Sequence, residues 1–295
     1  MTDVTATWGL EDVPWVHSTS RLRALEFDFA VRTADAGLGR YLDRIFGSLA
    51  VPGSPAHLYS LVDPDHAPFK LPRLFLDSEE IFAANEFPWV VEHLLWHINR
   101  QVVERSSSYL LLHSSAVERD GSALLFPASM ESGKTTLAAG MVRAGLRYVT
   151  DEAVAIAPAT GVVHPFPKAL AVDPGSWSTL ADFRPPVDAG LEWLTASQWQ
   201  VSPAAIRSDA VAGPCRPVLI ASPRYVAGAR TELLPLGRAD AVVMLIENAF
   251  NFSVHGGRGL ELLANMARAC ACFRLTIGDL DEACLLLLGA LDSLP

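Results

Sequence analysis

The order of apolar and polar residues along the chain predicts a series of strands and helices. Strands are expected where apolar and polar residues alternate or form short apolar runs, at 22–29, 57–62, 73–76, 109–113, 122–125, 146–150, 217–222, 231–235 and 272–277. Helices are expected where apolar residues recur every three or four positions, at 37–49, 85–104, 137–144, 239–249, 260–271 and 280–291. This mixture of elements predicts an α/β fold.

The predicted elements fall into two groups. Residues 1–105, which end in the long amphipathic helix 85–104, are expected to form a small N-terminal accessory α/β domain. Residues 106–295 are expected to form a second and larger α/β domain. Within it, the Trp- and Pro-rich stretch 173–215 has no clear periodicity and predicts an irregular insertion over a site.

Composition narrows the class of protein. The 33 acidic residues exceed the 23 basic ones, which gives a net charge of -10 and argues against nucleic-acid and anionic-membrane partners. The four cysteines have neither zinc-site nor disulfide spacing. No signal peptide is apparent at residues 1–5, and the longest apolar run, near 284–291, is too short to span a bilayer. We therefore expect a reduced, cytoplasmic protein.

The strongest chemical signal is the segment Phe126–Thr136, which reads FPASMESGKTT. A strand, a tight loop, Gly-Lys-Thr and a helix form the layout of a phosphate-binding P-loop. Backbone N–H groups and the positive helix N-terminus would surround a triphosphate, Lys134 would reach its β- and γ-phosphates, and Thr135 would bind Mg²⁺. The predicted nucleotide-binding residues are Ala128, Ser129, Met130, Glu131, Ser132, Gly133, Lys134, Thr135 and Thr136.

Two residues depart from the P-loop pattern. Ala128 stands where the pattern has glycine, and alanine resists positive φ. Glu131 adds a negative charge to a loop that should hold phosphate. The simpler alternative is a Ser-Gly-Lys-Thr sequence that begins an ordinary helix. The strand before the loop and the helix after it favour the P-loop.

Titratable residues are expected near this loop. His113 ends the predicted strand 109–113, and Asp151 and Glu152 follow the strand 146–150. Functional residues of open α/β sheets gather at the carboxyl ends of strands. We expect Asp151 to act as a general base, Glu152 to hold Mg²⁺, and His113 to orient Asp151 or polarise a phosphate. The ordinary alternatives are a solvated Asp151 and a core His113.

A second histidine pair lies on the predicted helix 85–104. His93 and His97 are four residues apart and share a helix face, which is the spacing of a metal half-site. No third ligand accompanies them, so two ordinary helix histidines are the favoured interpretation.

The segment from His113-Ser114-Ser115-Ala116 through the loop to Arg143–Glu152 resembles the kinase domain of HPr kinase/phosphorylase. It is most similar to the HPr-kinase-related proteins of peptide natural-product clusters, including lasso-peptide kinases. The resemblance covers about residues 109–175. It implies that residues 106–295 form a P-loop kinase core of HPr-kinase type, which uses ATP and Mg²⁺ to phosphorylate a Ser or Thr hydroxyl of a peptide or small protein.

The resemblance also implies residue roles and an assembly state. It gives His113, Lys134 and Asp151 as the catalytic set and Thr135 as a metal ligand. Glu152 is the nearest candidate for a further acidic metal ligand, Arg224 for an arginine of the family, and Lys168 for a contact to phosphate or a peptide carboxylate. A homo-oligomer is implied, either a hexamer, as HPr-type kinases form, or a smaller assembly.

Two other functions compete with a peptide kinase. The depleted glycine set suits a nucleotide-binding regulatory or peptide-recruiting module that transfers no phosphate. The second competing function is a kinase for a small metabolite, whose pocket would be lined by Trp177, Trp193 and Trp199. For these tryptophans, plain core packing is the simpler interpretation.

Overall fold

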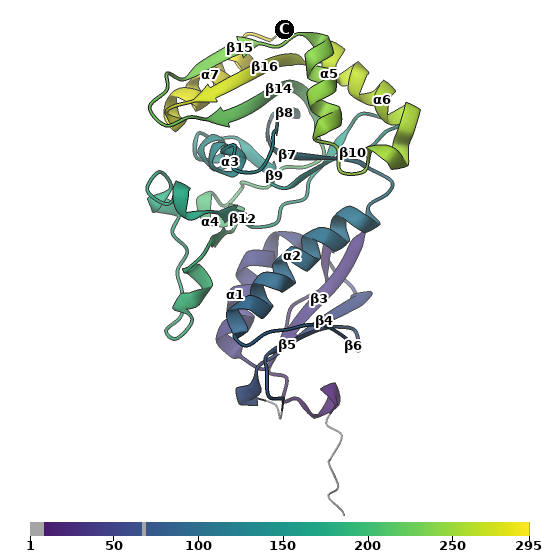
Figure 1. Cartoon of the computed structure of the whole chain (residues 1–295), viewed down its shortest axis with the longest axis vertical. Coiled ribbons are helices and arrows are strands. Elements are labelled where there is room, and N and C mark those ends of the chain that lie inside the picture. Colours follow the sequence, from purple (N-terminus) through teal and green to yellow (C-terminus); the bar gives the residue numbers. More distant parts are fainter. Residues whose placement is uncertain (1–8, 67–68, 295) are drawn as a thin grey trace, which may run out of the picture. The chain divides into compact units, whose positions relative to one another are not determined.

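The computed structural model describes residues 9–66 and 69–294, which form a mixed α/β protein with seven α-helices in this part of the chain (Figure 1). The chain divides into two compact units. The first contains the described residues up to Val102 and also Val187–Leu194, and the second contains Val103–Pro186 and the residues from Thr195 onward. The boundary expected from the sequence was residue 105, and the return of Val187–Leu194 to the first unit was not expected.

The first unit is built on a six-stranded sheet with two helices. Its elements are β1 (His17–Ser18), β2 (Leu22–Ala24), β3 (Phe27–Thr33), α1 (Ala36–Phe46), β4 (His57–Val62), β5 (Arg73–Leu76), β6 (Glu79–Ala83) and α2 (Phe87–Arg105). The strands lie in the order β1-β3-β4-β5-β6, with β2 paired to β3. Of these pairs, β3 and β4 run parallel and the others antiparallel. The single strand expected at 22–29 is a hairpin, because Leu25 adopts φ 54 and reverses the chain.

Helix α2 buries a slightly different stripe from the one expected. Helical spacing within 85–104 predicts a core stripe of Trp89, Val91, Leu95, Ile98 and Val102, but Trp89 is 57% exposed and Leu95 is only partly buried. The stripe that is buried begins one residue later and keeps helical spacing: Val90, Val91, Leu94, Ile98 and Val102. Packing against the sheet therefore sets the rotation of the helix.

The two histidines of α2 have separate partners. The His93 ring stacks on Phe82 with centroids 4.0 Å apart. His97 Nδ1 lies 2.7 Å from the hydroxyl of the buried Tyr59. Across residues 9–66 and 69–294, no group of three or more His, Cys, Asp or Glu side chains is placed to hold a metal ion. Both histidines thus contact aromatic side chains of the first unit.

The second unit is built on an eight-stranded mixed sheet. Its strands are β7 (Leu110–Arg119), β8 (Ser122–Pro127), β9 (Arg147–Thr150), β10 (Ala153–Ile156), β11 (Val163–His164), β14 (Arg216–Tyr225), β15 (Glu232–Pro235) and β16 (Ala271–Ile277). They lie in the order β11-β10-β7-β8-β14-β16-β15, with β9 also paired to β7. The three strands β8, β14 and β16 run parallel, and they end on the same side of the sheet.

Helices cover both faces of this sheet (Figure 1). They are α3 (Lys134–Arg143), α4 (Pro203–Ile206), α5 (Arg238–Glu247), α6 (Phe252–Ala269) and α7 (Leu280–Asp292). Along β8, Leu124 and Phe126 pack into the core shared with α3 and α7. Ala123 and Leu125 pack into the core shared with α5 and α6. This alternation follows from the two-residue period of a strand, and each large apolar side chain buried contributes about 1.5–3 kcal/mol.

Strand β7 is longer than expected. The strand predicted at 109–113 continues to Arg119, because Ser114–Arg119 pair with β8. His113 therefore lies inside a strand and not at its end. It still reaches the predicted site, because β7 runs antiparallel to β8 and Ser114 lies opposite Pro127, the last residue of β8.

The stretch expected to be irregular leaves the second unit and returns to it. Between β12 (Leu170–Val172) and β13 (Trp199–Val201) it contains 3-10 turns at Pro174–Ser176, Ala181–Phe183 and Glu192–Thr195, and the remainder of 173–215 includes β13 and α4. Its middle part, Val187–Leu194, belongs to the first unit. In the described residues, no helix combines the length and apolar character needed to cross a membrane.

Candidate functional site

The loop between β8 and α3 contains two residues with positive φ. Gly133 is the N-cap of α3 and has φ 90, a conformation that favours glycine. Glu131 has φ 60, and a side chain in this left-handed region costs about 1–2 kcal/mol. Among the described residues, Ala128 is not one of those with positive φ, so its methyl group brings no backbone strain.

Some polar groups of the loop form hydrogen bonds, and the Ser132 hydroxyl does not. Lys134 Nζ donates to the carbonyl oxygen of Ser129 at 2.6 Å. The Ser115 hydroxyl donates to the carbonyl oxygen of Lys134 at 3.0 Å and fixes the first turn of α3. The hydroxyl oxygen of Ser132 is buried and has no hydrogen-bond partner within the described residues. An unsatisfied buried hydroxyl costs about 1–3 kcal/mol, so this residue fits a loop that receives an oxygen-rich ligand.

Asp151 is held by four donors. Its Oδ1 accepts from the Tyr148 hydroxyl at 2.8 Å and pairs with Lys168 Nζ at 2.7 Å. Its Oδ2 accepts from the backbone N–H of Ala171 at 3.0 Å and from the Thr135 hydroxyl at 3.3 Å. The carboxylate is thereby fixed next to the first turn of α3 by groups of this chain.

Glu152 is the more accessible of the two carboxylates. Its side chain is 32% exposed and lies 3.8 Å from Lys168 Nζ. Burial, with a smaller contribution from the neighbouring Asp151, raises the pKa of Glu152 above its usual value, while Lys168 and Lys134 act in the opposite direction. A raised carboxyl pKa suits a group that takes up a proton near neutral pH.

His113 lies between the loop and the end of β10. Its backbone pairs with Ala153, the residue after Glu152, and the N–H of Ser114 donates to the Glu152 carbonyl oxygen at 3.3 Å. Burial and the positive charge of Lys134 lower the pKa of His113 to about 4. The imidazole is therefore neutral at neutral pH and has one donor and one acceptor nitrogen.

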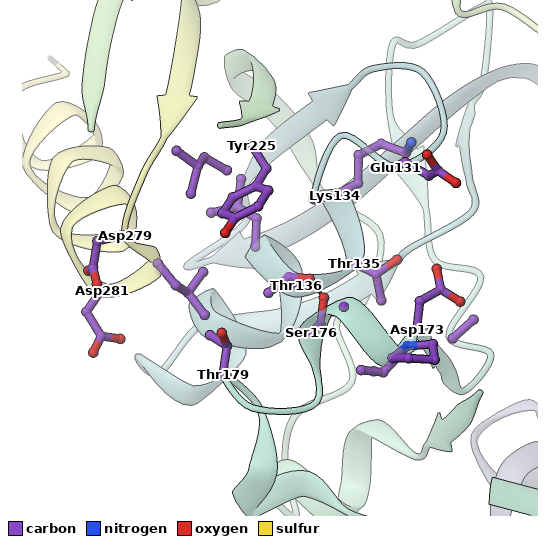
Figure 2. Close-up of a pocket in the computed structure, with 18 of the residues that line it drawn as sticks. Glu131, Lys134, Thr135, Thr136, Asp173, Ser176, Thr179, Tyr225, Asp279 and Asp281 are labelled. Atoms are coloured by element: carbon purple, nitrogen blue, oxygen red, sulfur yellow. Dashed lines mark hydrogen bonds between the residues drawn. The ribbon is translucent and has the colours of Figure 1, made fainter. Parts of the chain in front are cut away.

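A pocket of about 750 Å³ opens beside the loop (Figure 2). This volume is typical of pockets for small ligands. The lining residues are Glu131, Gly133, Lys134, Thr135, Thr136, Leu137, Arg143, Ala171, Val172, Asp173, Pro174, Gly175, Ser176, Thr179, Tyr225, Ile277, Gly278, Asp279, Leu280 and Asp281. Figure 2 shows Asp279 and Asp281 at one end, Glu131 and Lys134 at the other, and Tyr225 across from Ser176 and Thr179.

The structure gathers most of the residues expected at the site. Glu131 and Gly133–Thr136 line the pocket, whereas Ala128, Ser129, Met130 and Ser132 complete the loop outside this lining. The Met130 side chain is 79% exposed. His113, Asp151 and Glu152 lie at the β7 and β10 side of the loop, outside the pocket lining.

Three candidates from the sequence lie elsewhere. Lys168 is buried against the two carboxylates, so no ligand phosphate contacts it in this arrangement. Arg224 is exposed near the end of β14 and is not part of the pocket lining. The tryptophans are also absent from that lining: Trp177 stacks on Trp199 with ring centroids 4.9 Å apart, and Trp193 contacts Phe87 in the first unit.

Several pocket residues were not expected from the sequence. Ser176 reaches the site because its hydroxyl lies 2.5 Å from that of Thr136, and Tyr225 because its N–H donates to the Ser132 carbonyl oxygen at 3.1 Å. The position of Tyr225 at the end of a strand parallel to β8 was the available signal. Asp279 also lines the pocket, and its side chain caps α7 by accepting a hydrogen bond from the Glu282 N–H.

The chain matches no protein-family model and no curated protein. Its function is therefore argued from the geometry of the site.

Proposed function

We propose that this chain is an ATP-dependent kinase with a P-loop kinase core of HPr-kinase type in its second unit. It transfers the γ-phosphoryl group to a Ser or Thr hydroxyl of a peptide or small protein. The observation that carries the proposal is the β8–α3 loop, which combines a glycine N-cap, Lys134 and the unpartnered buried hydroxyl of Ser132 beside a pocket of ligand size. Helix N-termini with free N–H groups favour phosphate.

The triphosphate would lie along the loop. Lys134 is largely buried, and burial lowers its pKa, with Glu152 and Asp151 acting in the opposite direction. Its ammonium group is held on the Ser129 carbonyl oxygen, a contact that phosphate oxygens would replace. The rest of the nucleotide would occupy the pocket, where Tyr225 offers an aromatic face and Ser176 and Thr179 offer hydroxyl groups.

The residues present also fit a divalent cation. The Thr135 hydroxyl and the Asp151 carboxylate lie 3.3 Å apart, and oxygen ligands of this kind suit Mg²⁺. When bound, Mg²⁺ neutralises the negative charge that develops on the phosphate oxygens during transfer.

The contacts favour an exchange of the roles expected for the two carboxylates. The sequence suggested Asp151 as base and Glu152 as metal ligand. Asp151 already accepts four hydrogen bonds or ion pairs and is joined to Thr135, whereas Glu152 is accessible and has a raised pKa. We therefore propose that Glu152 is the general base that takes the proton of the acceptor hydroxyl. Asp151 and Thr135 would be the ligands of the metal ion. His113 would then act as a neutral hydrogen-bonding partner beside Glu152.

Two measurements test this proposal. Calorimetry should detect binding of ATP with Mg²⁺, and Lys134→Ala should weaken it at least tenfold. With γ-labelled ATP and a mixture of synthetic Ser and Thr peptides, Glu152→Gln should lower kcat by about 10²–10⁴-fold and leave ATP affinity unchanged. Asp151→Asn should mainly weaken the Mg²⁺-dependent part of ATP binding. Full kcat in Glu152→Gln would refute the base assignment, and absence of ATP binding would refute the kinase.

A nucleotide-binding module without transfer is the second candidate. The observation that favours it is Glu131, which combines a strained φ of 60 with a negative charge at the pocket wall. Wild-type protein that binds ATP but labels no peptide would select this alternative. A metabolite kinase with a tryptophan-lined pocket has no such support, because the three tryptophans lie outside the pocket lining.

A further inference from the structure

The connection between α5 and α6 bonds to the same edge of β7 as β8 does, next to the phosphate loop. Ala249 forms an antiparallel bridge with Leu112, and the His113 N–H donates to the Asn248 carbonyl oxygen at 2.7 Å. On its other edge, this part of β7 pairs with β10. The connection therefore lies on the same edge of β7 as β8, which pairs with Ser114–Arg119, and the phosphate loop leaves the sheet between them.

Asn251 holds this connection in place. Its Oδ1 accepts from the Leu111 N–H at 2.9 Å, and its Nδ2 donates to the Tyr109 carbonyl oxygen at 2.8 Å. The Phe250 N–H also donates to the Leu111 carbonyl oxygen at 2.9 Å. Because these bonds fix the backbone on both sides of Phe250, its side chain is presented from a pre-organised support.

Phe250 places an apolar ring at the edge of the charged site. Its ring centroid lies 5.3 Å from that of His113, and the residue is 43% exposed. Val254, four residues later, is 62% exposed. Phe250 thus offers apolar surface beside His113, outside the residues that line the nucleotide pocket.

The direction of phosphoryl transfer connects this surface to the acceptor. The attacking and leaving oxygens lie roughly in line on opposite sides of the transferred group. The leaving oxygen belongs to the nucleotide, whose pocket is lined by Tyr225 at the end of β14 and Ile277 at the end of β16. The attacking hydroxyl must then approach from the β7 side of the loop, where Phe250 lies beside His113.

We infer that Phe250 is a specificity-determining residue that packs against an apolar side chain next to the acceptor Ser or Thr of a peptide. This inference rests on the proposed kinase function and specifies its substrate class. Glu131 and Glu152 lie near the same loop, so an acidic side chain beside the acceptor would be repelled. The preferred acceptor is therefore flanked by apolar residues and not by acidic ones.

The test compares synthetic peptides that differ only beside a central Ser, with Leu, Asn or Asp at the flanking positions. In wild type, kcat/KM for the Leu-flanked peptide should exceed that for the Asn-flanked peptide about tenfold, as expected for burying one apolar side chain. Phe250→Ala should remove this difference, and Phe250→Leu should keep most of it. Val243→Ala, which removes another exposed apolar side chain on α5, serves as the matched control and should change neither value.

The ratio between peptides separates recognition from a general loss of activity. A purely structural effect of Phe250→Ala would lower both rates together, and calorimetry with ATP and Mg²⁺ checks that the nucleotide site is intact. If Phe250→Ala keeps the tenfold preference, or if the Asp-flanked peptide is the best substrate, the inference is wrong while the kinase stands. If wild type binds no ATP, or binds it and labels no peptide, the proposed function and this inference both fail.

Discussion

Glu131 shows that a single residue can weaken a phosphate loop in two ways. Its φ of 60 strains the backbone, and its carboxylate lies in the lining of the pocket next to Lys134. Glu131→Gly should relieve about 1–2 kcal/mol of strain and thereby stabilise the fold. Because it also removes a negative charge beside Lys134, the Kd for ATP with Mg²⁺ should fall about tenfold. Calorimetric titration measures this change.

A matched variant separates the two causes. Glu131→Gln removes the charge but keeps a side chain in the left-handed region, so it should recover only the electrostatic part of the gain. If Glu131→Gly binds ATP more weakly than wild type, the carboxylate contributes to ligand binding and the explanation above is wrong.

His113 gives a prediction about pH. Its pKa falls from the ordinary 6.5 to about 4 on folding, first because of burial and then because of Lys134. Between these two values the unfolded chain binds more protons at this position than the folded protein, so stability should decrease as the pH falls from 6.5 to about 4. An NMR titration of the imidazole resonances measures the folded pKa directly. Lys134→Met should raise it partway, and a wild-type value at or above 6.5 would contradict this account.

At the scale of elements, the packing of α3 against α7 depends on a glycine. A methyl group on Gly140 would lie 2.9 Å from Leu280 Cδ1 and 3.1 Å from Cys284 Sγ. Gly140→Ala should therefore lower the free energy of unfolding, although alanine is by about 1 kcal/mol the better helix former. Gly289→Ala on α7 is the control, because nothing lies within 4 Å of its added methyl group, and it should raise stability by about 0.5–1 kcal/mol. Urea denaturation of both variants tests the contrast, and equal effects would show that packing does not decide it.

The sequence predicted elements well where one periodicity dominated. Strand β8, the loop and α3 follow from an apolar run and Gly-Lys-Thr, and α7 agrees within one residue of the expected 280–291. The strand predicted at 109–113 is shorter than β7, because Ser114 and Ser115 look like the end of a strand. Their hydroxyls are satisfied inside the fold, by the carbonyl oxygens of Ser115 and Lys134 respectively. The partner of Ser115 is distant in the sequence and leaves no local pattern.

In the candidate site too, features that lie together in the sequence were predictable and features that depend on distant residues were not. The loop was predictable because its chemistry is contiguous in sequence. The environment of Asp151 was not, because its donors Tyr148, Lys168 and Ala171 converge only when β9 and the segment before β12 fold together. Exposure and hydrogen bonding, on which the proposed choice of Glu152 over Asp151 as base rests, become visible only in three dimensions.

At the scale of the whole molecule, the segment Val187–Leu194 makes the two units interdependent. Within the first unit, Asp188 pairs with Arg40 at 2.7 Å, Leu191 lies against Gly37, and Trp193 contacts Phe87. No local pattern marks this return, because it is a long-range contact within a Pro- and Trp-rich stretch. Residues 103–295 are therefore not a self-contained half of the protein.

Truncation tests this dependence. A chain limited to residues 103–295 would carry Val187–Leu194 without its partners and expose Leu191 and Trp193. Limited proteolysis should cut it first within 187–194, while the full chain is protected there. The exposed Leu191 and Trp193 should also make the truncated chain less soluble than the full chain. Replacing 187–194 by a Gly/Ser linker in the truncated chain should restore the solubility. Equal protection of this segment in both chains would show that it does not need the first unit.

The placement of Val187–Leu194 also has a consequence for the order of events during synthesis. Domains generally fold as units from the N-terminus while the chain is being made. Here the first unit lacks its last eight residues until position 194 has been translated, because Val187–Leu194 are the only part of it that follows Val102. By then β8, the phosphate loop and α3 have already left the ribosome. The unit that begins the chain is thus completed only after the β8–α3 loop of the other unit has been made.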